Sequence, residues 1–158
     1  IALGSIYNHF ASKDEIFEAV LLNHHPYLEI IPAILDAKGE SIEELLRDSA
    51  SQIIDGLGQH PDFLNLTFIE LVEFNGQHIP QLFDLISPTI LATSQRLVRW
   101  QDQLRPVPLP ILMRAFFGLF FSYFFTDLLI GKQMPPALTT NALDEFVEIF
   151  LHGIMAKG

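Results

Sequence analysis

The stretch GSIYNHFASK, residues 4–13, decides the fold of this chain. Within it Gly4, Tyr7, Phe10 and Lys13 recur every three residues, which predicts that they lie along one edge of a short helix and the turn after it. The residues between them include polar side chains that can form hydrogen bonds on the outer side. A short helix that starts with a small residue and presents such side chains suits the second helix of a helix-turn-helix.

This string resembles the recognition-helix signature of the TetR family of one-component transcriptional repressors, in which Gly, Tyr, Phe and Lys stand in this order ahead of a long helix. The resemblance implies an all-α, TetR-like fold with a partial helix-turn-helix followed by a helical ligand-binding and dimerisation domain. The chain starts at Ile1 and the motif starts partway through. We therefore expect two further helices upstream.

The resemblance also implies which residues contact operator DNA. Gly4 would let the helix start approach the sugar-phosphate backbone, Tyr7 and His9 would bind phosphate oxygens, and Lys13 would add a cation and helix-terminal amides. Ala2 departs from the family, which favours Ser there, so one phosphate contact is absent. The full predicted set is Leu3, Gly4, Ser5, Tyr7, Asn8, His9 and Lys13.

Composition limits the other possibilities. The net charge of the 158 residues is −10, which is the wrong sign for a protein that grips phosphates over its whole surface. Any DNA contact must therefore be local, with the acidic bulk held away from the duplex. The absence of cysteine excludes disulfides, thiolate metal sites and cysteine nucleophiles, and it is compatible with the cytoplasm. We predict neither a metal nor another cofactor.

Apolar residues recur at spacings of three and four throughout, which predicts helices and no sheet. Capping boxes begin two of them, Ser12 with Glu15 and Ser41 with Glu44. The predicted helices span residues 12 to about 23, 41 to about 57, 61–75, 80–101, from the proline-rich loop 106–110 to Gly131, and 141–156. Pro26 and Pro32 divide the first helix from the next segment, and Pro88 disturbs the fourth. Gly56 and Gly58 help to end the second. We predict two domains: the end of the helix-turn-helix with its connecting helix (1–30), and a ligand-binding and dimerisation domain (31–158).

The last two predicted helices need partners. Residues 115–125, AFFGLFFSYFF, are apolar on every side, so their helix must be covered by its own domain, by another subunit or by lipid. In the TetR family the last two helices pair with those of a second copy, which implies a twofold homodimer. The residues predicted for dimerisation are Phe116, Tyr123, Leu143, Phe146, Val147, Phe150, Leu151 and Ile154.

A membrane span is the alternative interpretation of this segment. Only twelve uncharged residues lie between Arg114 and Asp127, whereas a span needs about 20 mainly apolar residues. The sequence therefore favours a buried helix in a soluble dimer and no membrane contact.

The body is unusually rich in phenylalanine, with 14 in the chain. The TetR resemblance implies an effector pocket at its centre, apolar with a few polar groups, and thus a small apolar or aromatic effector. An aromatic stripe at helical spacing is also compatible with a plain core. The residues predicted to bind the effector are Phe63, Asn65, Thr67, Phe68, Glu70, Phe74, Phe117, Phe120, Phe121, Ser122 and Phe124.

No enzyme is predicted. The chain has no His-Glu-x-x-His, Gly-x-Ser-x-Gly or glycine-rich phosphate-loop string. The sequence favours a dimeric, cytoplasmic transcriptional repressor that a small effector releases from its operator. The alternatives are a helical ligand-binding or protein-interaction module without DNA function, and a small membrane protein.

Overall fold

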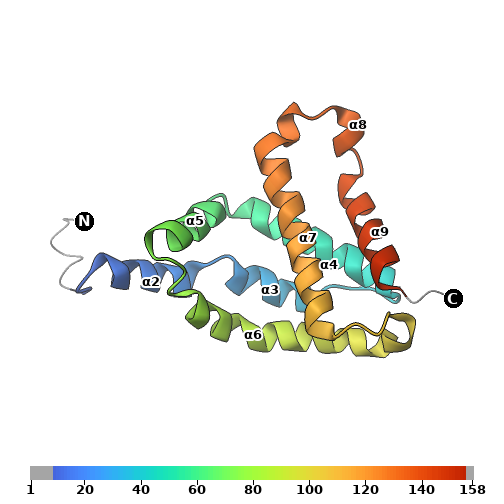
Figure 1. Cartoon of the computed structure of the whole chain (residues 1–158), viewed down its shortest axis with the longest axis horizontal. Coiled ribbons are helices and arrows are strands. Elements are labelled where there is room, and N and C mark those ends of the chain that lie inside the picture. Colours follow the sequence, from blue (N-terminus) through green and yellow to red (C-terminus); the bar gives the residue numbers. More distant parts are fainter. Residues whose placement is uncertain (1–8, 156–158) are drawn as a thin grey trace.

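The computed structural model describes residues 9–155, which are helical nearly throughout (Figure 1). Within this range no strand forms, apart from a single antiparallel bridge between Leu104 and Met155. The elements in chain order are α2 (Lys13–His24), α3 (Tyr27–Leu35), α4 (Ile42–Gln59), α5 (Phe63–Glu73), α6 (Ile79–Gln95), the 3-10 helix η1 (Arg96–Gln103), α7 (Leu109–Ile130), η2 (Gly131–Gln133), α8 (Pro136–Thr139) and α9 (Ala142–Ile154). The predicted all-α class is confirmed.

Both predicted capping boxes form. The hydroxyl oxygens of Ser12 and Ser41 each accept a hydrogen bond of 3.1 Å, from the backbone N–H groups of Glu15 and Glu44. Each glutamate carboxylate in turn accepts from the N–H of the residue before the serine, at 2.7 and 2.8 Å. These bonds satisfy backbone donors that the first helical turn leaves free, which is why α2 and α4 begin where the sequence predicts.

Helix breakers act differently along the chain. Pro26 separates α2 from α3, but Pro32 and Pro88 lie inside α3 and α6, which continue through them. Helix α4 runs to Gln59, two residues past the predicted end at about residue 57, so Gly56 and Gly58 lie within the helix and do not end it. A Cβ at Gly56 would lie 2.7 Å from Cγ1 of Ile30, so this glycine allows α3 and α4 to pack closely.

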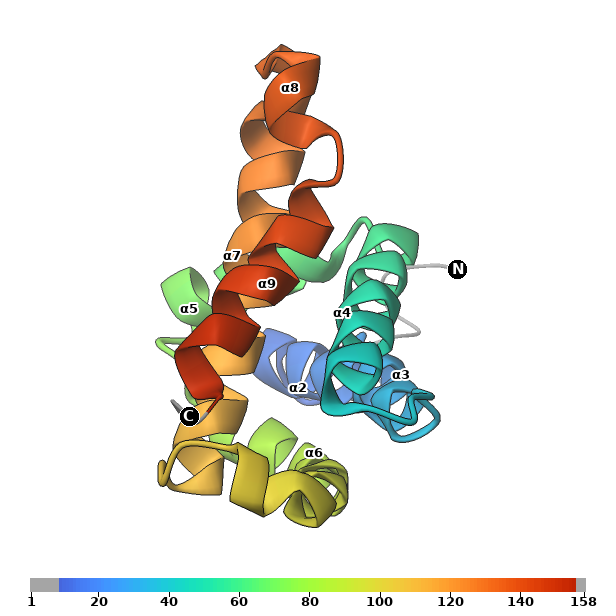
Figure 2. The ribbon, with the colours of Figure 1, turned by 90° about the vertical axis from the view of Figure 1, so that its right-hand side faces the viewer.

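The main core lies where α3, α4, α7 and α9 meet, with η1 closing one end. Figure 2 shows α7 and α9 side by side, rising with α8 above the rest of the molecule. Phe120 is wholly buried, and Phe116 packs against both Phe120 and Phe150. A smaller cluster of Ile31, Leu82 and Ile86 joins α3 to α6.

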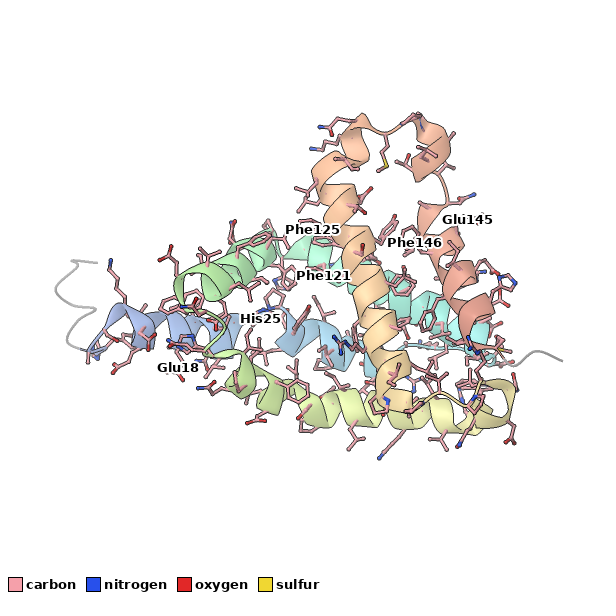
Figure 3. All side chains as sticks on the ribbon, viewed as in Figure 1. Glu18, His25, Phe121, Phe125, Glu145 and Phe146 are labelled. Carbon is pink, nitrogen blue, oxygen red and sulfur yellow. The ribbon has the colours of Figure 1, made fainter. Side chains whose placement is uncertain are left out.

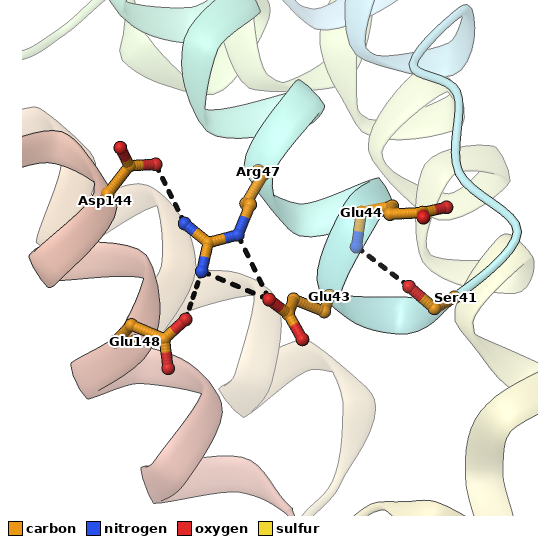
Figure 4. A network of polar contacts seen from close by, with 6 residues as sticks. All are labelled: Ser41, Glu43, Glu44, Arg47, Asp144 and Glu148. Atoms are coloured by element: carbon orange, nitrogen blue, oxygen red, sulfur yellow. Dashed lines mark hydrogen bonds and ion pairs between the residues drawn. The ribbon is translucent and has the colours of Figure 1, made fainter.

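An arginine links α4 to α9 on the surface (Figure 4). Arg47 contacts Asp144 of α9 at 2.8 Å, Glu43 of its own helix at 3.1 Å, and Glu148 of α9. Its side chain is 32% exposed, so solvent screens these pairs only in part. One cation thus neutralises carboxylates that would otherwise repel each other across the two helices.

Replacing Arg47 by alanine should lower the free energy of unfolding by about 1 kcal/mol, because the carboxylates then face one another without a cation. Urea unfolding of the full-length protein should show a larger loss at about 50 mM than at about 500 mM NaCl. Lys38→Ala is the matched control, since Lys38 is exposed and its ammonium makes no ion pair with residues 9–155. Equal losses in the two variants would contradict this role for Arg47.

Candidate functional site

The predicted DNA-contacting residues fall at the start of α2 or ahead of it. His9 and Lys13 are exposed, and Lys13 is the first residue of the helix. Leu3, Gly4, Ser5, Tyr7 and Asn8 lie outside the described residues. Helix α2 lies at one end of the molecule, opposite the C-terminal end of the chain (Figure 1). His9 and Lys13 are therefore open to a partner and are not covered by the body.

Helix α2 is attached to the turn between α5 and α6. The ring of Phe17 stacks on Phe74 with centroids 4.6 Å apart and lies 5.9 Å from the ring of His78. One turn earlier on α2, a carboxylate oxygen of Asp14 lies 3.5 Å from Nε2 of His78 and accepts a hydrogen bond from Gln77. Both contacts are on the same side of α2, so this turn fixes the orientation of the helix.

A buried carboxylate holds this turn between α5 and α6 in place. Glu70 of α5 has no exposed surface, and its oxygens accept from the backbone N–H of His78 and lie opposite Nδ1 of the same residue, each at 2.8 Å. Asn75 and Gly76 have φ values of 53° and 74°, and this left-handed pair reverses the chain so that His78 faces Glu70. A buried carboxylate is costly unless it is hydrogen-bonded, so Glu70 holds the turn in one conformation.

A mainly apolar cavity of about 260 Å³ lies beside this buried pair. It lies between α2, α3, α5, α6 and α7, and it opens to the surface beside Ile79 and Phe83, which are 40% and 56% exposed. Its lining residues are Leu21, His25, Tyr27, Thr67, Glu70, Ile79, Leu82, Phe83, Ile86 and Phe121. Figure 3 shows His25 and Phe121 in this region, one from the end of α2 and the other from α7. No lysine or arginine is among the lining residues.

The structure brings three of the predicted effector-binding residues to this cavity, namely Thr67, Glu70 and Phe121. Two more lie just behind its wall: Phe63 is buried against Phe121, with centroids 5.9 Å apart, and also contacts Phe124. The others lie elsewhere. Phe117 and Phe120 pack against Phe116, and Phe74 stacks on Phe17 of α2. Phe68 is 47% exposed, and Ser122 is also exposed. Asn65 borders a separate surface hollow near His24.

Sequence reasoning missed the cavity residues at the break between α2 and α3. Leu21 is wholly buried at the end of α2, and His25 caps that helix by donating its backbone N–H to the carbonyl of Leu21 at 3.2 Å. Pro26 comes next and turns the chain, which brings Tyr27 beside His25 with ring centroids 4.7 Å apart. The signal was a histidine directly before a helix-dividing proline, but spacing alone did not distinguish His25 from exposed His24.

Most residues predicted for dimerisation belong to the chain's own core. Phe116, Val147, Phe150, Leu151 and Ile154 are buried among α4, α7 and α9, so they join these helices and leave no surface for a partner. Tyr123, Leu143 and Phe146 are half-buried, with Tyr123 edge-on to Phe146 at 5.1 Å between centroids. A partner would instead meet exposed apolar residues on the same helices, which are Ile111, Leu128, Leu129 and Ile130 of α7, Leu138 of α8 and Ile149 of α9.

The segment Leu109–Gln133 is long and apolar enough to cross a bilayer, judged by length and composition alone. Only 22% of its most apolar window is buried inside the chain. Core helices of water-soluble proteins can pass the same test, so the finding is weak support for a membrane span. It does identify α7 as a helix with much of its apolar surface left uncovered. Among residues 9–155, no cluster of three or more His, Cys, Asp or Glu side chains could hold a metal ion.

Comparison with known proteins bears on the fold. No family model matches the sequence, and no curated protein does either. Among solved structures, the chain is similar to a TetR family transcription regulator from Marinobacter aquaeolei VT8, with a TM-score of 0.67 over 98% of this chain and 78% of the other, at 15% identity. The fold is TetR-like.

The TetR-like fold agrees with the resemblance drawn from residues 4–13. At 15% identity the likeness concerns the fold alone. The α2–α3 break at Pro26 falls close to the predicted domain boundary, and the division into 1–30 and 31–158 stays a prediction.

His25 is the one cavity residue whose charge state is strongly affected by its surroundings. Burial lowers the pKa of His25 from 6.5 to about 4, so the ring is neutral at pH 7. Burial also raises the pKa of Tyr27, which therefore stays a neutral phenol. With Glu70 fully engaged by His78, the polar groups of the cavity wall are neutral or already paired.

The depressed pKa of His25 predicts a pH-dependent stability. Between pH 6.5 and 4 the unfolded chain binds a proton that the folded chain does not, so the free energy of unfolding falls as the pH is lowered through this range. Going from about pH 7 to about pH 5 should cost about 2 kcal/mol more in the full-length protein than in its His25→Gln variant. Urea unfolding at the two pH values measures this difference. An identical pH response in the variant would contradict the buried, neutral state of His25.

Proposed function

We propose that this protein is a DNA-binding transcriptional regulator that responds to a small molecule, and that it acts as a repressor released from its operator by an apolar effector. The proposal rests on two features that occur together in this chain. The motif GSIYNHFASK ends at Lys13, the first residue of α2. The chain that contains it has a TetR-like fold over nearly its whole length. Residues 1–30 would read DNA, and residues 31–158 would bind the effector and a second copy.

Two features of α2 support the DNA-binding part. His9 and Lys13 are exposed at the end of the molecule, where a phosphate could reach both a cation and the free amides of the first helical turn. Asp14, Glu15 and Glu18 come immediately after, so the favourable potential is confined to the very start of the helix. The contact would be local, as the net charge of −10 requires.

The response to an effector would pass through the residues that the cavity and α2 share. Leu21 belongs to α2 and lines the cavity, and Glu70 lines the cavity while holding His78, which contacts Asp14 of α2. An effector that displaces these side chains would rotate α2 and the reading helix ahead of it. Two reading helices must lie about 34–36 Å apart to enter successive major grooves, so a small rotation in each copy weakens binding. A coupling free energy of about 1–3 kcal/mol is typical of such proteins.

Substitutions at the reading end should weaken binding to DNA from the protein's own promoter in a gel-shift assay. Tyr7→Ala should weaken it while leaving dimerisation intact. Lys13→Ala should in addition reduce the slope of log K against log salt by about 1 per copy, because one phosphate contact is lost. Lys132→Ala is the control, since Lys132 is exposed on η2 beyond the far end of α7 and should leave the slope unchanged. The assignment fails if Tyr7→Ala and Lys13→Ala both bind promoter DNA as tightly as the parent protein does.

The second copy would cover the apolar surface of α7 and α9. Along α7 the exposed positions Ile111, Ala115, Gly118 and Ser122 recur at three and four, and a Cβ at Gly118 would meet no neighbour within 4 Å. Small residues on such a stripe let another helix approach closely, and Ile149 of α9 extends the apolar surface. A twofold pairing of these helices would bury surface that a water-soluble monomer rarely exposes.

Ile149→Arg should convert a dimer to a monomer, because it places a charge in the proposed interface where Ile149 is now 63% exposed. Light scattering after gel filtration, without detergent, measures the mass. Leu85→Arg is the matched control, because Leu85 is 52% exposed on α6; this variant should remain a dimer. A monomeric parent protein would contradict the proposal. A protein that stays in solution only with detergent would contradict it too, and would favour contact of α7 with lipid.

A further inference from the structure

His25 gives the cavity a specific chemical preference. The backbone N–H of Tyr27 donates to Nδ1 of His25 at 3.2 Å, so Nδ1 carries no proton. A neutral imidazole has a single N–H group, and it must therefore lie on Nε2. The hydrogen bond to Tyr27 thus fixes the tautomer of the ring and makes Nε2 a donor.

This donor has no partner within residues 9–155. The only side-chain hydrogen bond of His25 in that range is the one at Nδ1. No fully buried side-chain nitrogen or oxygen in the described part of the chain lacks a partner, so Nε2 keeps some accessible surface. His25 is only 4% exposed and is one of the residues that line the cavity, and we therefore take the cavity as the space from which a ligand reaches Nε2.

Two other polar residues of the wall, Glu70 and Thr67, are already engaged within the chain, and the phenol of Tyr27 is the one further neutral hydrogen-bond donor among the lining side chains. Both carboxylate oxygens of Glu70 are engaged by His78, and the hydroxyl of Thr67 donates to the carbonyl of Phe63 at 2.9 Å. The remaining wall is aliphatic or aromatic, and it contains no lysine or arginine to neutralise an acid. A charged ligand would lose its hydration without gaining a counter-ion, which is costly.

We propose that the cavity binds a neutral, mainly apolar molecule with one carbonyl or ether oxygen, which accepts a hydrogen bond from Nε2 of His25. The proposal rests on the proposed function in taking the cavity as the effector site, and it names the chemical class of that effector. Because His25 caps α2 and Leu21 lies one turn before it, such a ligand would touch α2 directly.

Two probes of matched shape test the donor. Butyrophenone and butylbenzene differ by one carbonyl oxygen, and their binding to the full-length protein can be measured by equilibrium dialysis without DNA. One neutral hydrogen bond should make the ketone bind about fivefold more tightly. His25→Phe should remove this preference while keeping affinity for the hydrocarbon, and His24→Phe, at the exposed neighbouring histidine, should retain it.

A measurement on the unaltered protein removes the dependence on how the variants fold. In ¹⁵N-labelled protein the Nε2 resonance of His25 should shift on adding butyrophenone, while Nδ1 keeps the shift of an unprotonated nitrogen. Equal binding of the two probes, loss of the preference in His24→Phe, or an unchanged Nε2 resonance at saturating ketone would each overturn the proposal. Ketone binding by a protein that fails to bind promoter DNA would instead contradict the proposed function alone.

Discussion

The orientation of α2 depends on a single buried pair, Glu70 and His78. Glu70 is completely enclosed, and both of its oxygens are used by one residue across a turn with two left-handed backbone positions. Removing one member of such a pair leaves a buried polar group without its partner, which typically costs about 3–5 kcal/mol when the pair is charged. The turn therefore has one favoured conformation, and it holds Phe74 and His78 where Phe17 and Asp14 of α2 can pack on them.

Glu70 of this pair also lines the cavity between α2, α3, α5, α6 and α7, so the residue that fixes the turn is in reach of a bound ligand. Helix α2 contributes Leu21 and its cap His25 to the cavity wall, and α5 contributes Glu70. The side chains that would contact a ligand in the cavity therefore include those that hold α2 in its direction, and no further residues are needed to connect the two. Such a shared element is the physical requirement for coupling two sites, because a ligand can shift an equilibrium only through contacts that differ between its two states.

The sequence predicted the elements of the fold better than it predicted their surfaces. Local signals, such as the Ser12 and Ser41 caps and the division at Pro26, were confirmed because each is decided within four or five residues. The cavity depends instead on how five helices meet, so Thr67, Glu70 and Phe121 were found while His25 and Leu21 were not. Hydrophobic periodicity also cannot separate a core face from a partner face. The stripe of Val147, Phe150 and Ile154 was assigned to a partner but is buried within the chain.

The distance between the two copies of α2 in a dimer tests the central claim most directly. The 158 residues contain no cysteine, so Ala11→Cys, at an exposed position just before α2, allows site-specific spin labelling. Electron–electron distance measurements would be made with and without butyrophenone, at a concentration where dialysis shows the cavity to be occupied. Coupling through Leu21, His25 and Glu70 predicts that the interspin distance distribution shifts on binding. An unchanged distribution at full occupancy would contradict it, because the cavity and α2 would then be independent.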